Sequence, residues 1–259
     1  MIEQASRTAT REVVRSVLAA DCACPASAFV EDGLFVTTAE ERPGRRRYPR
    51  SAKPLGVVTM GRGVVVSCHP TWIAWLQETL GNRSRETIFS APTITELARF
   101  VAQEGEVLLG PALSHVCAHE AFRPAVDPAG VIFSVVEGKD VFDLYQHFDF
   151  EDALDYEPDY PRPDVAAAVA RRAGRIIGIA GMSADSDALW QIGIVVVAEE
   201  RGAGIGRALV GRLTEYAFRR NRVPFYTADV GNVRSHALAA SLGYWPAWVE
   251  LVARERGPG

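Results

Sequence analysis

The clearest pattern of apolar and polar positions lies between residues 190 and 220. The apolar run from Trp190 to Ala198 is rich in β-branched residues and too short for a helix, so it indicates a strand covered on both faces. Further along, apolar residues recur at helical spacing, at Leu209, Leu213, Tyr216 and Ala217. The pattern predicts a buried strand that leads through a short turn into an amphipathic helix.

Weaker patterns of the same kind predict the other elements of the second half. Strands are expected at residues 131–137, 165–170, 175–182 and 225–230. Helices are expected over residues 140–150 and 232–242. The prolines between Tyr156 and Pro163 indicate an irregular loop.

The start of the chain predicts a helix, a loop and a hairpin. Valines and a leucine at helical spacing indicate a helix over residues 8–20. Five arginines lie among prolines and a glycine between Arg42 and Arg50, which is typical of a solvated loop. Two apolar runs, at residues 55–60 and 64–67, flank a glycine-containing turn and predict two paired strands.

Two more helices are predicted before residue 110. Pro70 suits a first helical turn and Gly81 a helix end, and the tryptophans between them are expected in the core. Thr93 and Glu96 have the spacing of a capping box, which predicts the start of the next helix. The first half is therefore expected to be α+β, without a recognisable catalytic motif.

Turn-forming residues between Arg123 and Gly130 give the best position for a domain boundary. We expect an N-terminal α+β domain of unknown role over residues 1–129 and a C-terminal domain over residues 130–259. The 259 residues, 48% of them hydrophobic, are enough for two such cores. The predicted fold class is α/β (α+β), with a mixed central sheet flanked by helices in the C-terminal domain.

Composition narrows the classes of partner. The 28 basic and 32 acidic residues give a net charge of −4, which argues against a general nucleic-acid-binding surface. No apolar run approaches the roughly 20 residues that span a bilayer, and the start of the chain lacks the apolar core of a signal peptide. We predict a cytoplasmic protein without nucleic-acid or membrane partners.

The four cysteines do not have the spacing of a secreted disulfide framework, so reduced thiols are expected. His115, Cys117 and His119 would share one face of a strand, which is the only pattern that suggests a metal site. Three alternating ligands on one strand lie close together, and a half-buried sheet edge explains the same residues. We therefore predict no metal.

Glycines alternate with other residues where the helix is predicted to start, in the segment Arg201-Gly202-Ala203-Gly204-Ile205-Gly206-Arg207. Glycines there cost backbone entropy, but they let a ligand approach the backbone. The first N–H groups of a helix lack helical partners, and with the helix dipole and two arginines they suit a phosphate. The alternative is a glycine-rich turn that only connects strand and helix.

The spacing of these glycines disagrees with two familiar phosphate loops. The dinucleotide fingerprint G-x-G-x-x-G would need a glycine where Arg207 or Leu209 stands, although Asp229 lies about where that fold places its ribose-binding acid. The loop G-x-x-x-x-G-K-[ST] fails because no Lys-Ser or Lys-Thr follows the glycines.

The segment resembles instead the R-x-x-G-x-G acyl-CoA signature of the GNAT superfamily of N-acyltransferases, at Arg201, Gly204 and Gly206. Downstream, the residues Asn232 to Ser235 and Leu242-Gly243-Tyr244 are similar to the N-x-x-[AS] and L-G-[FY] ends of these domains. The resemblance implies a GNAT fold in the C-terminal domain and acetyl-CoA as co-substrate.

Residues 181–186 and 190–194 resemble the diagnostic stretch of a two-domain GNAT subgroup with a divergent N-terminal half. In GNAT domains the central strand parts from its neighbour, and its free backbone groups hold pantetheine and polarise the thioester carbonyl. The resemblance places these groups at Val195 to Val197. The residues expected to bind the co-substrate are Val195, Val196, Val197, Arg201, Gly202, Ala203, Gly204, Ile205, Gly206, Arg207, Asn232 and Ser235.

The catalytic side chains are less well defined. Many family members carry a tyrosine as general acid seven residues after the motif asparagine, and Ala239 occupies that position here. Tyr226, Ser235 and Tyr244 are the candidates to replace it. Asp185 lies in a polar run before the central strand and is predicted as the base or as an acceptor anchor, the alternative being a turn-forming aspartate.

Two classes of function follow from these features. The first is an N-acetyltransferase that moves an acetyl group from acetyl-CoA to a primary amine of a small molecule or peptide, by direct attack in a ternary complex. The second is a catalytically silent acyl-CoA-binding or sensor protein, which Ala239 favours. The sequence does not identify the acceptor, and it leaves open whether the protein forms a homodimer.

Overall fold

The computed structural model describes residues 6–47, 53–154 and 162–255. The chain folds into two compact units whose segments alternate along the sequence. Unit 1 contains the segment up to Val13, His115–Thr227 and Asn232–Pro246. Unit 2 contains Val14–Ser114, Ala228–Gly231 and the segment from Ala247 onward. The division of the chain at residues 129 and 130 stays a prediction.

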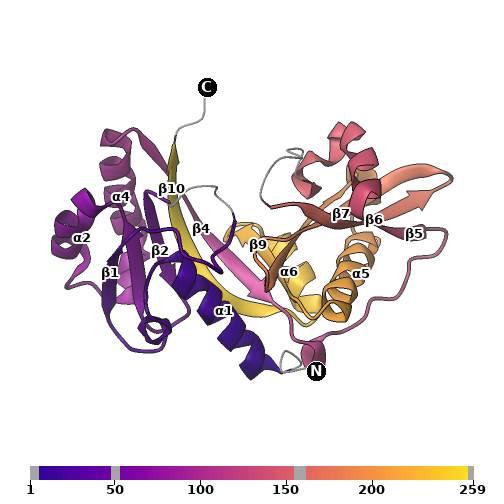
Figure 1. Cartoon of the computed structure of the whole chain (residues 1–259). Helices are drawn as coiled ribbons and strands as arrows, with labels where there is room; N and C mark the ends of the chain where they lie inside the picture. Colours follow the sequence, from indigo (N-terminus) through magenta and orange to yellow (C-terminus); the bar gives the residue numbers. More distant parts are fainter. Residues whose placement is uncertain (1–5, 48–52, 155–161, 256–259) are drawn as a thin grey trace. The chain divides into compact units, whose positions relative to one another are not determined.

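Unit 1 is built on a mixed sheet with the strand order β9-β8-β7-β6-β5 (Figure 1). The strands are β5 (Ile132–Glu137), β6 (Asp164–Arg172), β7 (Arg175–Ser183), β8 (Leu189–Val196) and β9 (Val223–Asp229). From β5 to β8 neighbouring strands are antiparallel, whereas β9 runs parallel to β8. Ala173 and Gly174 connect β6 to β7 with φ angles of 50° and 83°, as a two-residue hairpin turn requires.

Helical segments pack on both faces of this sheet. α5 (Ile205–Arg219) contacts β6, β7 and β8, and α6 (Val233–Ser241) packs against α5. On the other face, η4 (Gly138–Gln146) contacts β6 and η5 (Phe148–Ala153) contacts β7 and β8. Two short 3-10 turns, η3 (His119–Ala121) and η6 (Ala198–Glu200), complete the unit.

The predicted strands of the second half and its two α-helices are confirmed, with one difference over residues 140–150. This segment forms the two 3-10 helices η4 and η5 instead of one α-helix. The backbone leaves helical geometry at His147, where φ is −98° and ψ is 75°. Val141 and Leu144 are nevertheless buried against β6 and β7, as the helical spacing predicted.

Unit 2 contains the strand order β1-β3-β2-β10-β4. The strands are β1 (Leu34–Thr38), β2 (Leu55–Thr59), β3 (Val64–Cys68), β4 (Glu106–Val116) and β10 (Trp245–Glu255). The antiparallel pair β2 and β3 is the predicted hairpin; β10 is antiparallel to β2, and β1 is parallel to β3. The α/β (α+β) fold class is therefore confirmed.

Helices cover the core of unit 2, and the predicted packing of the tryptophans is confirmed. The helical segments are α1 (Arg7–Asp21), η1 (Ala26–Phe29), η2 (Pro70–Trp72), α2 (Ile73–Leu80), α3 (Arg85–Ile88) and α4 (Ala91–Gln103). Trp75 stacks on Phe100 with ring centroids 3.8 Å apart, and Trp72 meets the same ring edge-on. Both tryptophans belong to the apolar core.

The predicted capping box at Thr93 is wrong. α4 begins at Ala91, two residues earlier, with Ser90 as the N-cap residue. Thr93 is buried, and its hydroxyl donates to the carbonyl of Thr87 at 2.7 Å and accepts from Arg83 at 2.8 Å. Its hydroxyl therefore ties α4 to the preceding turn and caps no helix.

The predicted solvated loop at residues 42–50 is wrong for Arg46. This residue is 6% exposed, and its guanidinium contacts Asp21 and binds both carboxylate oxygens of Glu250, at 2.9 and 2.8 Å. Burial alone would raise the pKa of Glu250, but Arg46 and Lys53 outweigh it and hold that pKa well below its usual range. Residues 48–50 lie outside the described part of the chain.

Most of the proline-rich loop predicted at 156–163 also lies outside the described residues. Among the helices that the structure describes, none combines the length and apolar character needed to cross a membrane.

Candidate functional site

The central feature of unit 1 is the end of β8, where one neighbouring strand leaves it. β8 pairs with β7 from Gln191 through Val196. Its pairing with β9 covers only three residues and ends where Gln191 faces Phe225. Beyond that point the two parallel strands part, and the last residues of β8 have lost one of their two neighbours.

The backbone groups that face this gap follow from the alternation of an antiparallel ladder. Val197 donates its N–H to the carbonyl of Ile177 at 3.1 Å, so Val197 and Val195 direct their backbone groups toward β7. Ile194 and Val196 therefore direct theirs into the gap. Val195 and Val196 line a cavity there, as predicted for co-substrate contacts, but Ile194 does so in place of Val197.

The glycine segment forms the turn into α5. Gly204 is the N-cap residue and has a φ of 82°, a left-handed conformation that favours glycine. A Cβ on Gly206 would lie 3.0 Å from Leu238 Cδ1 and 3.3 Å from Ile194 Cδ1. Gly206 thus lets α5 approach both α6 and β8, which brings the N–H groups of the first helical turn next to the gap.

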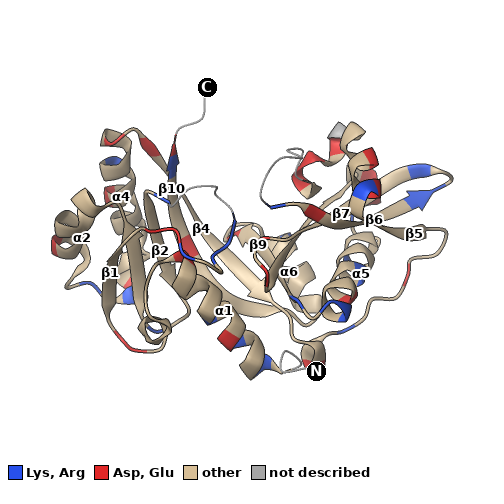
Figure 2. Ribbon diagram, viewed as in Figure 1, with Lys and Arg blue, Asp and Glu red and all other residues tan. Residues whose placement is uncertain are grey.

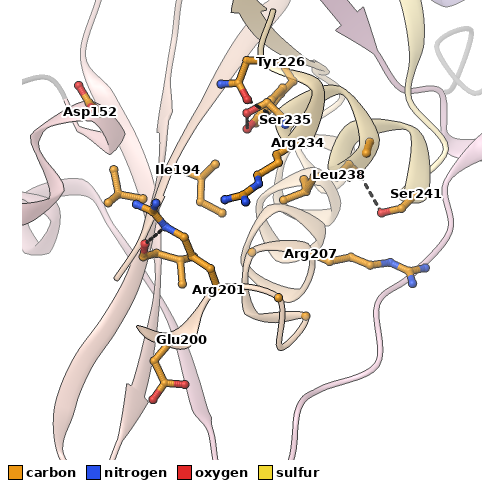
Figure 3. A pocket seen from close by; sticks show the side chains of 17 residues that line it. Asp152, Ile194, Glu200, Arg201, Arg207, Tyr226, Arg234, Ser235, Leu238 and Ser241 are labelled. Carbon is orange, nitrogen blue, oxygen red and sulfur yellow. Dashed lines mark hydrogen bonds between the residues drawn. The ribbon is translucent and has the colours of Figure 1, made fainter. Parts of the chain in front are cut away.

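These features meet in one cavity of about 780 Å³ (Figure 3). Its walls come from the end of β8, one residue of η6, the glycine segment, Tyr226 of β9, α6 with its cap residue, and one residue of η5. The lining residues are Asp152, Ile194, Val195, Val196, Glu200, Arg201, Gly202, Gly204, Gly206, Arg207, Tyr226, Asn232, Arg234, Ser235, Ala237, Leu238 and Ser241. Of the predicted co-substrate residues, the cavity lining leaves out Val197, Ala203 and Ile205.

Three arginines give the cavity a positive surplus over its two acidic residues. Figure 3 shows Arg201 and Arg234 extending toward Ile194, while Arg207 extends away from them. Nε of Arg201 donates to the carbonyl of Val196 at 2.9 Å. Arg234 is a residue that the sequence reading missed, although its place two residues after the motif asparagine made it detectable.

A tyrosine and a serine lie together where the strands part. Tyr226 is the first residue of β9 after its last pair with β8, and its hydroxyl donates to Ser235 Oγ at 3.3 Å. Asn232 caps α6 by accepting the N–H of Ser235 at 3.2 Å, which fixes the serine. Burial raises the pKa of the Tyr226 phenol, partly offset by its bond to Ser235, so the phenol is protonated at neutral pH.

Tyr244, in contrast, does not line the cavity. It is 4% exposed, and its hydroxyl lies 2.6 Å from Thr214 Oγ1 on the buried side of α5. Burial raises the pKa of its phenol well above the ordinary value. The contacts of Tyr244 are those of a core residue, and we do not retain it as a catalytic candidate. Ala239 is fully buried in α6.

Asp185 also lies outside the main cavity. It is 2% exposed, accepts a hydrogen bond from Ser183 Oγ at 2.8 Å and faces the guanidinium of Arg162 at 3.5 Å. These contacts fit an anchor for other polar groups. They do not bring its carboxylate to the parted strands.

The three residues considered for a metal site do not share one strand. β4 ends at Val116, and His119 begins a 3-10 turn. Among the described residues, no group of three or more His, Cys, Asp or Glu side chains is arranged to hold a metal ion.

Comparison with known proteins gives a family match over part of the chain. The model of the acetyltransferase (GNAT) family matches residues 138–244. These residues include β6 to β9, the glycine segment and α6, and hence all of the cavity lining. No curated protein matches the chain.

Several solved structures are similar to the chain at low identity. A GCN5-related N-acetyltransferase from Kribbella flavida is 19% identical over 63% of this chain and 64% of its own, with a TM-score of 0.47. A putative GNAT-family acetyltransferase from Novosphingobium aromaticivorans is 17% identical over 57% and 66%, with a TM-score of 0.45. A GCN5-related N-acetyltransferase from Sphaerobacter thermophilus is 18% identical over 82% and 79%, with a TM-score of 0.47. The chain thus spans just under two thirds of the length of the first two.

Proposed function

Because residues 138–244 form a domain of the GNAT acetyltransferase family, we propose that this protein transfers an acetyl group from acetyl-CoA to a primary amine. The observation that carries the proposal is the meeting of two features in one cavity. The parted end of β8 supplies backbone groups for pantetheine, and the N-terminus of α5 supplies N–H groups for the pyrophosphate. Neither feature alone would specify acyl-CoA.

In this proposal the co-substrate lies between α5 and α6. The pyrophosphate binds at Gly204 and Gly206, with Arg201 and Arg234 supplying positive charge from two sides. Pantetheine then runs along β8 and pairs with the backbone of Ile194 and Val196. Such pairing would supply hydrogen-bond partners to the β8 backbone beyond Phe225, where its pairing with β9 ends.

The same backbone donors suit the chemistry. Attack of the amine nitrogen on the thioester carbonyl forms the C–N bond and places negative charge on the carbonyl oxygen. A fixed N–H donor at that oxygen typically contributes about 3 kcal/mol. The C–S bond then breaks, the amine loses a proton to water, and the CoA sulfur gains one.

Tyr226 is our candidate for the proton donor to the departing sulfur. Its phenol is protonated, lies at the fork of the strands and is held by Ser235. Tyr226 would thus take the role of the general-acid tyrosine that many family members carry at the position of Ala239. A thiol with a pKa of about 8.5 is a fair leaving group, so the help expected from a general acid is near the low end of the usual range, roughly 100-fold.

The test is Tyr226→Phe, with Tyr244→Phe as the matched control. We expect Tyr226→Phe to lower kcat for CoA release by roughly 100-fold while the calorimetric affinity for CoA stays the same. Tyr244→Phe should leave kcat unchanged, because its hydroxyl bonds only within the core. Equal kcat values for wild type and Tyr226→Phe would remove Tyr226 from the reaction.

The alternative function is a protein that binds acyl-CoA without turning it over. Ala239 favours this alternative, because the usual general-acid tyrosine is missing at its position. A panel of primary amines incubated with acetyl-CoA distinguishes the two functions. Release of CoA thiol with any amine supports the enzyme. Calorimetric binding of acetyl-CoA without release on any amine supports the silent protein.

A further inference from the structure

A second cavity, of about 200 Å³, lies in unit 1 beside η5. We call it the polar pocket, because Glu151, Asp152, Arg162, Asp164, Ser183 and Gln191 line it. Asp152 lines both this pocket and the larger cavity. On β8, Gly193 lines the polar pocket and the next residue, Ile194, lines the larger cavity. Both cavities therefore adjoin β8 close to where it leaves β9.

Two paired glycines fix Asp152 at this place. Gly181 of β7 faces Gly193 of β8. A Cβ on Gly181 would lie 2.0 Å from the carbonyl oxygen of Ala153, and one on Gly193 would lie 3.0 Å from that of Asp152. The backbone of η5 therefore sits directly on the glycines. Any side chain there would displace η5 and, with it, Asp152.

The charges of the polar pocket do not balance. Its one cation, Arg162, faces the buried carboxylate of Asp185 at 3.5 Å and donates to Gln191 Oε1 at 3.2 Å. Glu151, Asp152 and Asp164 add three further carboxylates. Asp164 accepts a hydrogen bond from the hydroxyl of Tyr145 at 2.8 Å. The helical segments η4 and η5 carry further acidic residues, Asp140, Asp143 and Asp149, and acidic positions are red on the ribbon of Figure 2.

Size limits what the pocket can take. Cavities for drug-sized ligands measure about 300–1,000 Å³, so about 200 Å³ suits a short aliphatic chain. A carboxylate on that chain would meet three like charges, whereas a second ammonium group would meet three opposite ones.

We propose that the polar pocket binds the acceptor, and that the acceptor is a small diamine. One amino group lies at Asp152, which faces both cavities, and the second lies as an ammonium group among Glu151 and Asp164. The inference rests on the proposed function, since the amine at Asp152 is the one that attacks the thioester. That amine loses its proton to water before attack, its nitrogen bonds to the acetyl carbon, and CoA leaves as the thiol. The product is a monoacetylated diamine.

Three acceptors of equal length test the class of substrate. They are 1,4-diaminobutane, butylamine, which lacks the second charge, and 4-aminobutyrate, which reverses it. We expect kcat/KM for the diamine to exceed that for butylamine by about tenfold or more, and 4-aminobutyrate to be the poorest of the three. If 4-aminobutyrate is the best acceptor, Arg162 and not the carboxylates selects the substrate, and the proposal is overturned.

Substitutions in the polar pocket test whether its carboxylates cause the preference for the diamine. Glu151→Gln and Asp152→Asn change exposed residues, so both variants should fold. Each should raise KM for the diamine by about tenfold and bring it closer to butylamine. Glu151→Gln should do so with no change in CoA affinity, because Glu151 does not line the larger cavity. Asp149→Asn is the control, because Asp149 is an exposed acid on the same helical segment that does not line the pocket. Equal KM values in all four proteins would place the acceptor elsewhere.

Calorimetry separates failure of this inference from failure of the proposed function. If CoA binds and other amines are acetylated but the diamine is not, only the acceptor class is wrong. If CoA binds and nothing is acetylated, 1,4-diaminobutane is titrated into the CoA complex. The pocket is supported if the diamine binds and Asp152→Asn weakens that binding. The proposal is overturned if the diamine does not bind. If CoA does not bind, both proposals fall.

Discussion

Two of the loops that carry arginines beside glycines, one in each unit, use these arginines in opposite ways. In unit 2, Arg46 turns inward and forms ion pairs with Asp21 and Glu250. In unit 1, Arg201 stays exposed at the start of the glycine segment, and its side chain donates to the carbonyl of Val196. One arginine holds elements of the fold together, and the other lines the cavity of unit 1.

The two arginines differ in whether the carboxylates near them already form ion pairs with other arginines. The acids next to Arg201 in sequence are Glu199 and Glu200, and they form ion pairs with Arg175 and Arg172. Their charges are therefore directed away from Arg201. Arg46, in contrast, meets two buried carboxylates that have no other arginine among the described residues. A loop arginine serves the fold where distant acids reach it and remains available where nearby acids are already paired.

The largest effect that this comparison predicts is on the stability of unit 2. Arg46→Met removes the positive charge between two buried carboxylates, and breaking such a pair from one side typically costs about 3–5 kcal/mol. We expect the free energy of unfolding to fall by that amount in a denaturant titration. Arg42→Met changes an exposed arginine of the same loop and should alter it by less than about 0.5 kcal/mol.

A double substitution sharpens this prediction. Adding Glu250→Gln to Arg46→Met neutralises one of the two stranded carboxylates, so the double variant should be more stable than Arg46→Met alone. A double variant that loses further stability would show that Glu250 contributes through other contacts, such as those with Lys53 and Trp248.

The same contrast explains which features could be predicted from the sequence. The strand over residues 190–198, the turn at Gly204 and the cap at Asn232 depend on neighbours a few positions away, so local pattern reveals them. The burial of Arg46 depends on Glu250, 204 positions further along, and no local pattern contains it. The predicted cap at Thr93 was wrong because the spacing of a capping box also occurs inside this helix. The true cap residue, Ser90, makes no side-chain hydrogen bond to the helix.

The candidate site divides in the same way. Motif spacing along the chain led to residues such as Val196 and Gly206, which line the cavity, and their role in binding the co-substrate stays a prediction. The sequence reading missed Asp152, since its position depends on the close contact of η5 with Gly181 and Gly193. It also offered Tyr226, Ser235 and Tyr244 as candidates for the general acid. Only the register of β8 and β9 shows that Tyr226 stands at the fork, while Tyr244 faces Thr214.

The second prediction tests the glycine segment with two variants of nearly equal shape. Gly204 has a φ of 82°, and a Cβ there would meet only Pro128 Cγ at 3.7 Å, so Gly204→Asn and Gly204→Asp should both fold. Asparagine and aspartate also tolerate left-handed geometry better than most residues. We expect Gly204→Asp to bind CoA about tenfold or more weakly than Gly204→Asn, because its charge faces the pyrophosphate.

Calorimetric titration of CoA into both variants measures this difference. Circular dichroism checks that both are folded. Equal affinities would mean that no phosphate approaches Gly204, and the glycines would then serve only the turn.

The smallest effect is predicted for Arg201, the exposed counterpart of Arg46. Arg201→Gln should weaken CoA binding by about two- to fivefold, since an exposed charge is well solvated and screened. The loss should shrink at high salt, because the wild-type interaction is itself screened there. The free energy of unfolding should be unchanged, because the Arg201 side chain is exposed and donates to a carbonyl at the end of β8. Titrations of CoA at low and high salt, with thermal unfolding of both proteins, measure these effects. A loss of stability approaching that of Arg46→Met would mean that Arg201 supports the fold, and the contrast between the two loops would then no longer separate structural from ligand-binding arginines.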